Sequence, residues 1–284
     1  MRFTKMHGAG NDYLYIDART LNADWPALAQ KMSDRHFGVG SDGIIILQKP
    51  TVDGAQARMR IFNADGSEAE MCGNGVRCFV KFAIERDIVP PSEQGVRVQT
   101  GAGPIVVYPQ FKDKKVTGAR VNMGQPRLRP IEVPVQVPGI DLNKTLIGQS
   151  LTVEGTTVSF TAVSMGNPHA VAFIQQPVAE FPLHTVGPKV EHHPYFPRRV
   201  NFEIVNIEGQ GKLRARVWER GSGETLACGT GVCAIAVAAR LQGLAGDRVE
   251  ITMPGGTLNV EWDGQGVVWL EGPAVEVCEG DWPE

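Results

Sequence analysis

The chain lacks the charge and hydropathy features that mark proteins acting on nucleic acids or in membranes. Its 284 residues carry 28 Lys and Arg against 31 Asp and Glu, and they form no basic stripe. Residues 1–7 contain no apolar signal-peptide segment, and an apolar run such as residues 232–239 is too short to span a bilayer. We therefore expect a cytoplasmic protein with no nucleic-acid partner and no membrane attachment.

Cysteine is scarce, and its five copies are not spaced as a metal site or a disulfide framework. Cys72 and Cys78 are separated by five residues, and Cys228 and Cys233 by four, without a histidine nearby. A chain of this length has enough core to need no disulfides. We expect free thiols and no bound metal. Cys78, Cys233 and Cys278 lie within apolar patterns, which predicts buried side chains.

One motif occurs twice, and each copy places a cysteine directly before a Gly-x-Gly turn. The copies are M-C-G-N-G-V-R-C at residues 71–78 and A-C-G-T-G-V-C at residues 227–233. After the first Gly-x-Gly turn, apolar residues recur at helical spacing, which predicts an amphipathic helix. After the second turn nearly every residue is apolar, which predicts a helix enclosed on all sides. Pro90 and Pro91 are expected to end the first helix.

Local patterns predict a mainly β chain around these two helices. Alternating or apolar segments such as residues 3–7, 58–63 and 213–218 are typical of strands. Asp24, with Pro26 soon after it, predicts the start of a further helix. Four prolines in residues 126–138 favour irregular or edge structure.

The two cysteine motifs belong to a longer internal repeat. Cys72 and Cys228 are 156 positions apart (228 − 72), and residues 60–63 with 216–219, residues 10–11 with 166–167, and Glu68 with Glu224 share this offset. We interpret the chain as two copies of one β-rich domain, each wrapped around a central helix. A ligand of such a pair is expected at the domain interface, with the two cysteines on its opposite sides.

Two thiols facing one ligand suit the inversion of a carbon that carries an acidic proton. One thiolate removes the proton, and the second thiol returns a proton to the other face. A helix N-terminus stabilises a thiolate, and its N–H groups can hold a substrate carboxylate and the enolate-like charge. This chemistry requires neither a metal nor a pyridoxal cofactor. The residues alone leave two alternatives open: an anion-binding turn with a lone thiol, and a Cys72–Cys228 disulfide formed by oxidation.

The two motifs resemble those of the diaminopimelate epimerases. The resemblance extends to K-M-H-G-A-G-N-D at residues 5–12, G-N-P-H at residues 166–169 and E-R-G at residues 219–221, and it spans nearly the whole chain. It implies an α+β fold of two pseudosymmetric, barrel-like β-rich domains, each around a central helix, with the active site in the cleft between them. We expect these domains at residues 1–118 and 119–273, with residues 274–284 returning to the first.

The resemblance also implies an isomerase that converts LL-2,6-diaminopimelate to the meso form without pyridoxal phosphate, for lysine and peptidoglycan synthesis. It implies that Cys228 accepts the proton and Cys72 donates one in this direction, with His169 and Glu219 near the reacting centre. It further implies a homodimer. The implied substrate contacts are Asn11, Asn63, Gly73, Asn74, Asn167, Asn201, Glu219, Arg220, Gly229 and Thr230.

Two positions depart from the family pattern. Gly43 stands where many members have Gln, and Cys278 stands where a Tyr often supports a dimer. The related proline racemases typically carry His at the position of Asn74, and the phenazine-type isomerases of this fold lack both cysteines. A proline- or hydroxyproline-type racemase and a non-catalytic amino-acid-binding protein are the alternative functions.

Overall fold

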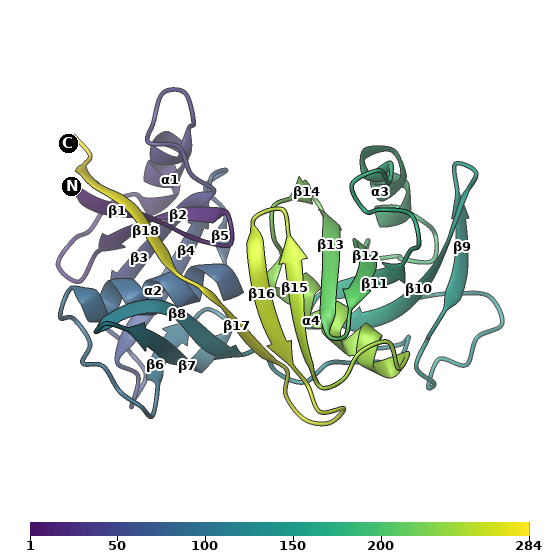
Figure 1. Cartoon of the computed structure of the whole chain (residues 1–284). Helices are drawn as coiled ribbons and strands as arrows, with labels where there is room; N and C mark the ends of the chain where they lie inside the picture. The colour runs from purple at the N-terminus through teal and green to yellow at the C-terminus, as the bar shows by residue number, and fades with distance from the viewer. Residues whose placement is uncertain (284) are drawn as a thin grey trace. The chain divides into compact units, whose positions relative to one another are not determined.

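The computed structural model describes residues 1–283, and the chain divides into two compact units. Unit 1 comprises Met1–Asn122 and the chain from Glu271 onward, and unit 2 comprises Met123–Leu270. Figure 1 labels the helices and strands of both units, and β17 (Trp269–Pro273) crosses the boundary between them.

Unit 1 is a mainly antiparallel sheet around one buried helix. The sheet order is β18–β1–β2–β3–β4–β6–β7–β8, with parallel pairs at β2/β3 and β4/β6. Helix α2 packs against β1, β2, β7 and β8, so the predicted central helix is confirmed. The elements are β1 (Arg2–Gly8), β2 (Asn11–Asp17), α1 (Trp25–Ser33), β3 (Gly43–Gln48), β4 (Ala57–Asn63), β5 (Glu68–Ala69), α2 (Gly73–Glu85), β6 (Val96–Thr100), β7 (Gly103–Lys112), β8 (Lys115–Asn122) and β18 (Val275–Asp281).

The start of α1 is confirmed, whereas the predicted end of α2 is wrong. The Asp24 side chain accepts a hydrogen bond from the Ala27 N–H, which satisfies a free donor of the first turn of α1. Helix α2 ends at Glu85, before Pro90 is reached. Asp87 turns the chain there with a left-handed φ of 53°, so the helix has ended before the prolines begin.

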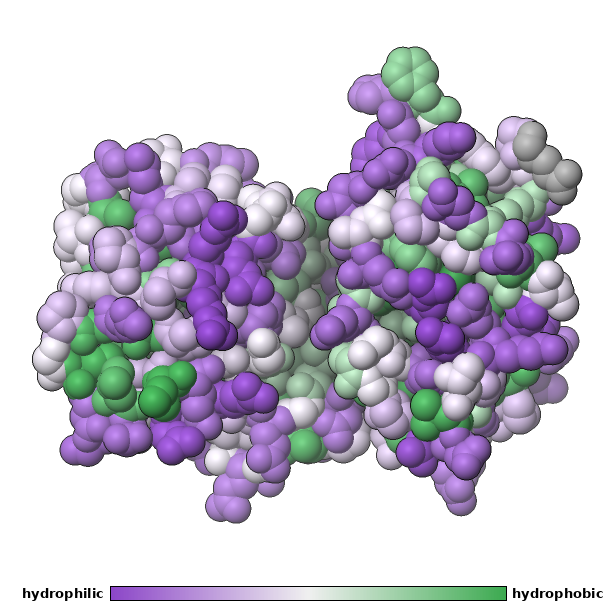
Figure 2. Space-filling view, turned by 180° about the vertical axis from the view of Figure 1, so that it is seen from behind, coloured by the Kyte–Doolittle hydropathy of each residue, from purple (hydrophilic) through white to green (hydrophobic). Residues whose placement is uncertain are grey.

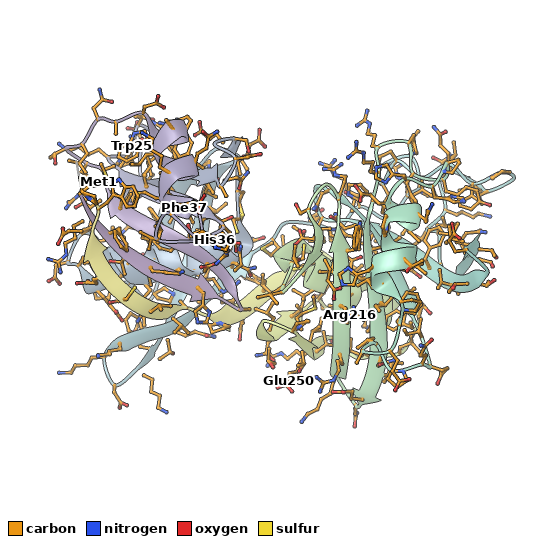
Figure 3. All side chains as sticks on the ribbon, turned by 90° about the horizontal axis from the view of Figure 1, so that it is seen from above. Met1, Trp25, His36, Phe37, Arg216 and Glu250 are labelled. Carbon is orange, nitrogen blue, oxygen red and sulfur yellow. The ribbon has the colours of Figure 1, made fainter. Side chains whose placement is uncertain are left out.

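Helix α1 covers one apolar face of the unit 1 sheet. Its Trp25 and Met32 pack with Leu14 and Ile44 of β2 and β3 in one buried cluster. Met1 packs against the same cluster, and Figure 3 labels both Met1 and Trp25.

Unit 2 repeats this arrangement around α4. The sheet order is β9–β10–β11–β12–β13–β15–β16, with parallel pairs at β11/β12 and β13/β15 and with β14 paired to β13. Helix α4 packs against β10, β11, β12, β15 and β16 and is buried nearly all round, as its composition predicts. The elements are β9 (Gln149–Val153), β10 (Thr156–Ser164), β11 (Pro168–Phe173), α3 (Leu183–Glu191), β12 (Asn201–Gly209), β13 (Lys212–Glu219), β14 (Gly223–Thr225), α4 (Gly229–Leu241), β15 (Arg248–Met253) and β16 (Gly256–Glu261).

The internal repeat is confirmed by matching strand pairs and by a matching ion pair in each unit. Arg60 binds Glu68 through two hydrogen bonds, and Arg216 binds Glu224 in the same way. Arg216, labelled in Figure 3, also donates to the carbonyl of Val178 at 2.6 Å. Each pair joins a strand of the main sheet, β4 or β13, to the short strand that precedes the cysteine helix, β5 or β14.

Strand β18 brings the end of the chain back to its beginning within unit 1. The Met1 amino group donates to the Trp282 carbonyl at 2.6 Å, and Figure 1 shows both termini on this unit. Cys278 on β18 is exposed, so the prediction that it is buried is wrong, whereas Cys78 and Cys233 are buried as predicted. The error arises because β18 is an outer strand that leaves both of its faces partly open.

On the face that Figure 2 shows, hydrophilic side chains cover much of each unit. None of the four helices in residues 1–283 combines the length and the hydropathy that a membrane span requires.

Candidate active site

In unit 1, Cys72 is the N-cap of the buried helix α2. Its backbone is extended, and its Sγ accepts a hydrogen bond from the Gly75 N–H at 3.3 Å. A Cβ on Gly75 would lie 2.6 Å from Cδ1 of Ile45, so glycine lets α2 approach β3 this closely without displacing the Ile45 side chain. The sequence therefore places a half-buried thiol where helix N–H groups converge.

Asn11 contacts the Cys72 thiol through an amide that Asp42 orients. The thiol donates to Asn11 Oδ1 at 3.4 Å, and Asn11 Nδ2 donates to Asp42 Oδ2 at 2.7 Å. The backbone N–H of Asp12 donates to the same carboxylate oxygen at 3.0 Å. Asp42 thus turns the amide oxygen of Asn11 toward Cys72.

Charged and aromatic side chains surround this contact. Burial would raise the pKa of Asp12, but hydrogen bonds from Arg35 and Lys5 outweigh burial and hold that pKa below its usual value. Tyr15 donates from its hydroxyl to the carbonyl of Gly75 at 3.0 Å. Burial, followed by the nearby Cys72 and Asp42 charges, raises the pKa of Tyr13.

Two further residues implied for unit 1 lie at the edges of this half-site. Asn63 ends β4, directly across from Gly43, and its amide donates to Ser67 Oγ at 3.0 Å. Asn74 is buried in the first turn of α2. A Cβ on Gly43 would lie 2.2 Å from the Phe62 carbonyl, so this backbone excludes the Gln that many family members carry there.

Gly73 is held by the buried side chain of Arg77. Arg77 donates to the Gly73 carbonyl at 3.0 Å and, through Nε, to the Pro273 carbonyl at 3.2 Å. The returning end of the chain therefore braces the first turn of the Cys72 helix.

In unit 2, Cys228 is the N-cap of α4, and its surroundings are more enclosed. The residue is buried, and its Sγ lies 3.4 Å from the Thr230 hydroxyl. Burial raises the pKa of the Cys228 thiol well above its usual value, and the negative charges of Glu219 and Glu203 raise it further. These surroundings therefore favour the protonated thiol at Cys228.

A chain of hydrogen bonds continues from Thr230 into the interior of unit 2. Asn167 Nδ2 donates to Thr230 Oγ1 at 3.2 Å, and Asn167 Oδ1 lies 3.0 Å from His169 Nε2. His169 Nδ1 lies 2.6 Å from Glu203 Oε1. Burial raises the pKa of Glu203, and the neighbouring His169 opposes that rise.

Asn201 and its neighbours form a second group in unit 2. Asn201 is buried, donates to the Pro168 carbonyl at 2.9 Å and accepts from the Arg220 N–H at 2.9 Å. The Arg220 guanidinium donates to the Arg198 carbonyl at 3.2 Å. Glu219 accepts a hydrogen bond from Thr225. Asn201 therefore fixes the backbone of the turn that carries Glu219 and Arg220.

The structure thus places Asn11 at Cys72, and Thr230, Asn167 and His169 in one chain at Cys228. No three His, Cys, Asp or Glu side chains in the described chain converge as a metal site. Sequence reasoning missed Asp42 and Glu203. Glu203 had a usable signal, because it is a carboxylate inside the otherwise apolar strand segment of residues 202–205.

The sequence model of the family described as diaminopimelate epimerase matches residues 3–129 and 161–277. The chain belongs to this family. It is 47% identical to a diaminopimelate epimerase of Desulfovibrio desulfuricans over 99% of this chain and 98% of the relative. It is 44% identical to one of Acetivibrio thermocellus, with the same two coverages.

Solved structures with much lower sequence identity share the fold of the diaminopimelate epimerase family. A probable proline racemase from Agrobacterium radiobacter, with bound carbonate, is 14% identical with a TM-score of 0.68, covering 99% of this chain and 92% of that one. A hydroxyproline epimerase from Agrobacterium vitis, with bound trans-4-hydroxy-L-proline, is 15% identical with the same TM-score, covering 99% and 91%. The expected fold, two β-rich halves each around a central helix, is confirmed.

Proposed function

We propose that this protein epimerises LL-2,6-diaminopimelate to meso-2,6-diaminopimelate, without pyridoxal phosphate, in the synthesis of lysine and peptidoglycan precursors. The observation that carries the proposal is the pair of cysteines that N-cap equivalent buried helices, Cys72 on α2 and Cys228 on α4. Full-length identity of 44–47% to diaminopimelate epimerases supports the choice of substrate.

Cys228 and Cys72 act as the base and the acid. In the LL-to-meso direction, the Cys228 thiolate removes the α-proton from one face, and the Cys72 thiol delivers a proton to the other. Cys228 ends as the thiol and Cys72 as the thiolate, so the reverse reaction exchanges the two roles. The S–H of Cys72 already donates to Asn11 Oδ1, which suits the acid form.

The substrate supplies the charge that Cys228 requires. The negative charge of Glu219 raises the pKa of the Cys228 thiol, so a substrate ammonium group beside Glu219 would offset that effect and ease thiolate formation. The N–H groups at the start of each helix, at Gly73, Asn74, Gly229 and Thr230, are suited to hold the reacting carboxylate and the charge that develops when the proton leaves.

The distal end of the substrate carries a second ammonium and a second carboxylate. Arg220 offers a fixed positive charge, and the amides of Asn63, Asn167 and Asn201 can both donate and accept. Asn11 and His169 complete the proposed substrate contacts near the reacting carbon. We further propose a homodimer and a cytoplasmic location, as the family resemblance implies.

The test is deuterium uptake at the substrate α-carbon in heavy water, measured by NMR together with conversion to the meso form. Cys72→Ala and Cys228→Ala should each abolish epimerisation, because each variant lacks the group that serves one face. Cys278→Ala is the matched control, since it removes an exposed thiol and should leave the rate unchanged. Near-normal epimerisation in either of the first two variants would refute the two-base mechanism.

The alternatives are separated by substrate. A panel containing proline and trans-4-hydroxyproline, followed by polarimetry, identifies a racemase of the same fold. Tight binding of diaminopimelate without proton exchange would identify a binding protein.

A further inference from the structure

Glu203 is a buried carboxylate that the proposed reaction does not yet use. It lies on β12, is 0% exposed, and its Oε1 accepts or shares the proton of His169 Nδ1 at 2.6 Å. Within the described residues its second oxygen, Oε2, has no hydrogen-bond partner. A buried carboxylate is costly, and strands seldom keep one without a reason.

The register of the sheet explains why Glu203 reaches His169. Strands β11 and β12 are parallel, and His169 pairs with Asn201. Glu203 stands two residues further along β12, so it leaves the same face of the sheet as Asn201. Its Oε1 also lies 3.0 Å from the position of a Cβ on Gly231, in the first turn of the Cys228 helix.

The hydrogen-bond directions along the chain depend on the Glu203–His169 pair. Asn167 gives its amide N–H to Thr230, so its oxygen faces His169 Nε2, which must then carry a proton. One proton lies between His169 Nδ1 and Glu203 Oε1, because two unprotonated atoms would repel at 2.6 Å. With Asn167 held in this way, the Thr230 hydroxyl accepts from the amide and points its own hydrogen toward Cys228 Sγ.

The other half of the repeat lacks this chain. Ile45 of β3 lies between Tyr15 and Ile61 on the neighbouring strands. Glu203 of β12 lies between Val171 and Val217, which are the repeat partners of those two residues. Ile45 and Glu203 are therefore equivalent positions of the two units. Ile45 also contacts Gly75 as Glu203 contacts Gly231. The scaffold therefore accepts an aliphatic side chain at this position, and the carboxylate of Glu203 is not needed to build the fold.

We propose that Glu203 is a positioning residue for proton transfer at Cys228. It fixes His169 through Nδ1, and through His169 and Asn167 it directs the Thr230 hydroxyl at the thiol. A hydroxyl directed in this way stabilises the Cys228 thiolate that forms when substrate binds. Being fully buried, Glu203 orients the chain without contact to substrate.

The ionisable groups around the Cys228 thiol come from three strands within the described part of unit 2. They are Glu203 of β12, Glu219 of β13 and, through Asn167, His169 of β11. Removal of the Glu203 charge takes away one of the two negative charges that raise the Cys228 pKa. Glu203→Ile and Glu203→Gln both remove this charge, so a difference between them in Cys228 ionisation reports the directed hydroxyl alone.

Two variants of the full chain separate positioning from charge. Glu203→Ile copies the residue of the other half and removes both the charge and the hydrogen bond. Glu203→Gln removes the charge but can donate from its amide to His169 Nδ1, which retains the tautomer. Glu191→Gln is the matched control, because Glu191 is a buried glutamate of the same unit that binds Trp218 and Gly221 instead.

The first measurement is iodoacetamide alkylation of Cys228 against pH, quantified by peptide mass spectrometry, with Cys72 as the internal reference. The Cys228 profile of Glu203→Ile should lie at higher pH than that of Glu203→Gln, because only the glutamine variant keeps the Thr230 hydroxyl directed at the thiol. The Cys72 profile should be the same in both variants. Glu191→Gln should shift neither. Coincident Cys228 profiles in the two Glu203 variants, or an equal difference between the variants at both cysteines, overturn the proposal.

The second measurement is epimerisation kinetics, and this arm rests on the proposed function. We expect Glu203→Ile to lower kcat by roughly 10–100-fold, the loss typical of residues that orient a reacting group, and to leave KM within about threefold of the wild-type value. Glu203→Gln should recover at least about tenfold of that loss. Equal kcat in the two variants overturns the positioning role. A wild-type protein that does not turn over diaminopimelate refutes the proposed function and leaves alkylation to decide the inference.

Discussion

Lys81→Met tests whether a buried ion pair fastens the Cys72 helix to its sheet. Lys81 Nζ donates to Glu85 Oε1 and to the Val116 carbonyl, each at 2.7 Å, and Glu85 Oε1 accepts from the Val116 N–H at 2.9 Å. Both backbone groups of Val116 in β8 are thereby satisfied by side chains of α2. Methionine retains the length of the side chain and removes the charge and both donated hydrogen bonds.

The expected loss follows from what the substitution leaves behind. Breaking one side of a buried pair costs about 3–5 kcal/mol, because the partner charge stays buried and unpaired. The Glu85 side chain is 22% exposed and can reach water, so we expect the lower range, about 2–4 kcal/mol. For a unit of this size that corresponds to a Tm lower by roughly 6–15 °C.

Differential scanning calorimetry of the full chain measures this loss. Lys144→Met is the matched control, because its side chain is 83% exposed, and it should leave the Tm within about 2 °C of the wild type. The double variant Lys81→Met with Glu85→Leu should recover about half of the loss, since it removes the unpaired charge. If Lys81→Met also stays within about 2 °C of the wild type, the pair does not fasten α2 to β8.

Two further predictions concern packing and pH. Gly187→Ala should lower the free energy of unfolding by about 1–3 kcal/mol in urea titrations, because the new Cβ would lie 2.6 Å from the Trp218 ring. Alanine favours helix more than glycine does, so a gain in stability would show that the Trp218 ring moves aside without cost. Burial raises the pKa of Cys78 from 9.0 to about 11, so the folded chain keeps a proton that the unfolded chain loses in this window. Stability should therefore fall as pH rises from 9 to 11, by about 2–3 kcal/mol more in the wild type than in Cys78→Val. An equal pH dependence of the two proteins in that range would contradict this assignment.

Local sequence signals predicted the elements whose cause is local. Asp24 caps α1 because its carboxylate lies three residues before the free N–H of Ala27, and this spacing is sufficient for the capping hydrogen bond. Cys72 and Cys228 begin their helices because each precedes a turn of small residues that can pack closely against a strand. Helix α3 was missed because Pro188 lies inside it and no side chain caps its start. Its stability comes from burying Leu183 and Val186 against unit 2, which is a tertiary effect.

The chemical neighbours of the two cysteines were harder to predict, because they depend on pairing between strands. Asp42 and Asn11 are distant in sequence and meet only because β2 and β3 are parallel neighbours. The family resemblance supplied Asn11 and His169. It did not supply the groups that orient them, Asp42 and Glu203.

The repeat itself shows why Glu203 escaped a fixed-offset comparison. Tyr15 and Val171 are 156 positions apart (171 − 15), but their strand partners Ile45 and Glu203 are 158 apart (203 − 45). The connection between the paired strands is therefore two residues longer in unit 2, and the next strand returns to the original offset. At this slip in the alignment, an apolar contact of the Cys72 helix is replaced by a carboxylate beside the Cys228 helix.

That replacement bears on the reaction, because inversion requires two cysteines in opposite protonation states. Two identical half-sites would hold both thiols alike, and one of the two protonation states would then lack its stabilising contacts. Cys72 has an acceptor at its S–H, the Asn11 oxygen, whereas Cys228 has the hydroxyl of Thr230 at the end of a chain that starts at Glu203. If Glu203→Ile and Glu203→Gln differ in the pH profile of Cys228 alkylation and not in that of Cys72, this one strand position contributes to the asymmetry between the half-sites. If the two variants give the same Cys228 profile, the hydrogen-bond chain contributes nothing, and Glu219, whose charge also raises the Cys228 pKa, is left as the source of the asymmetry.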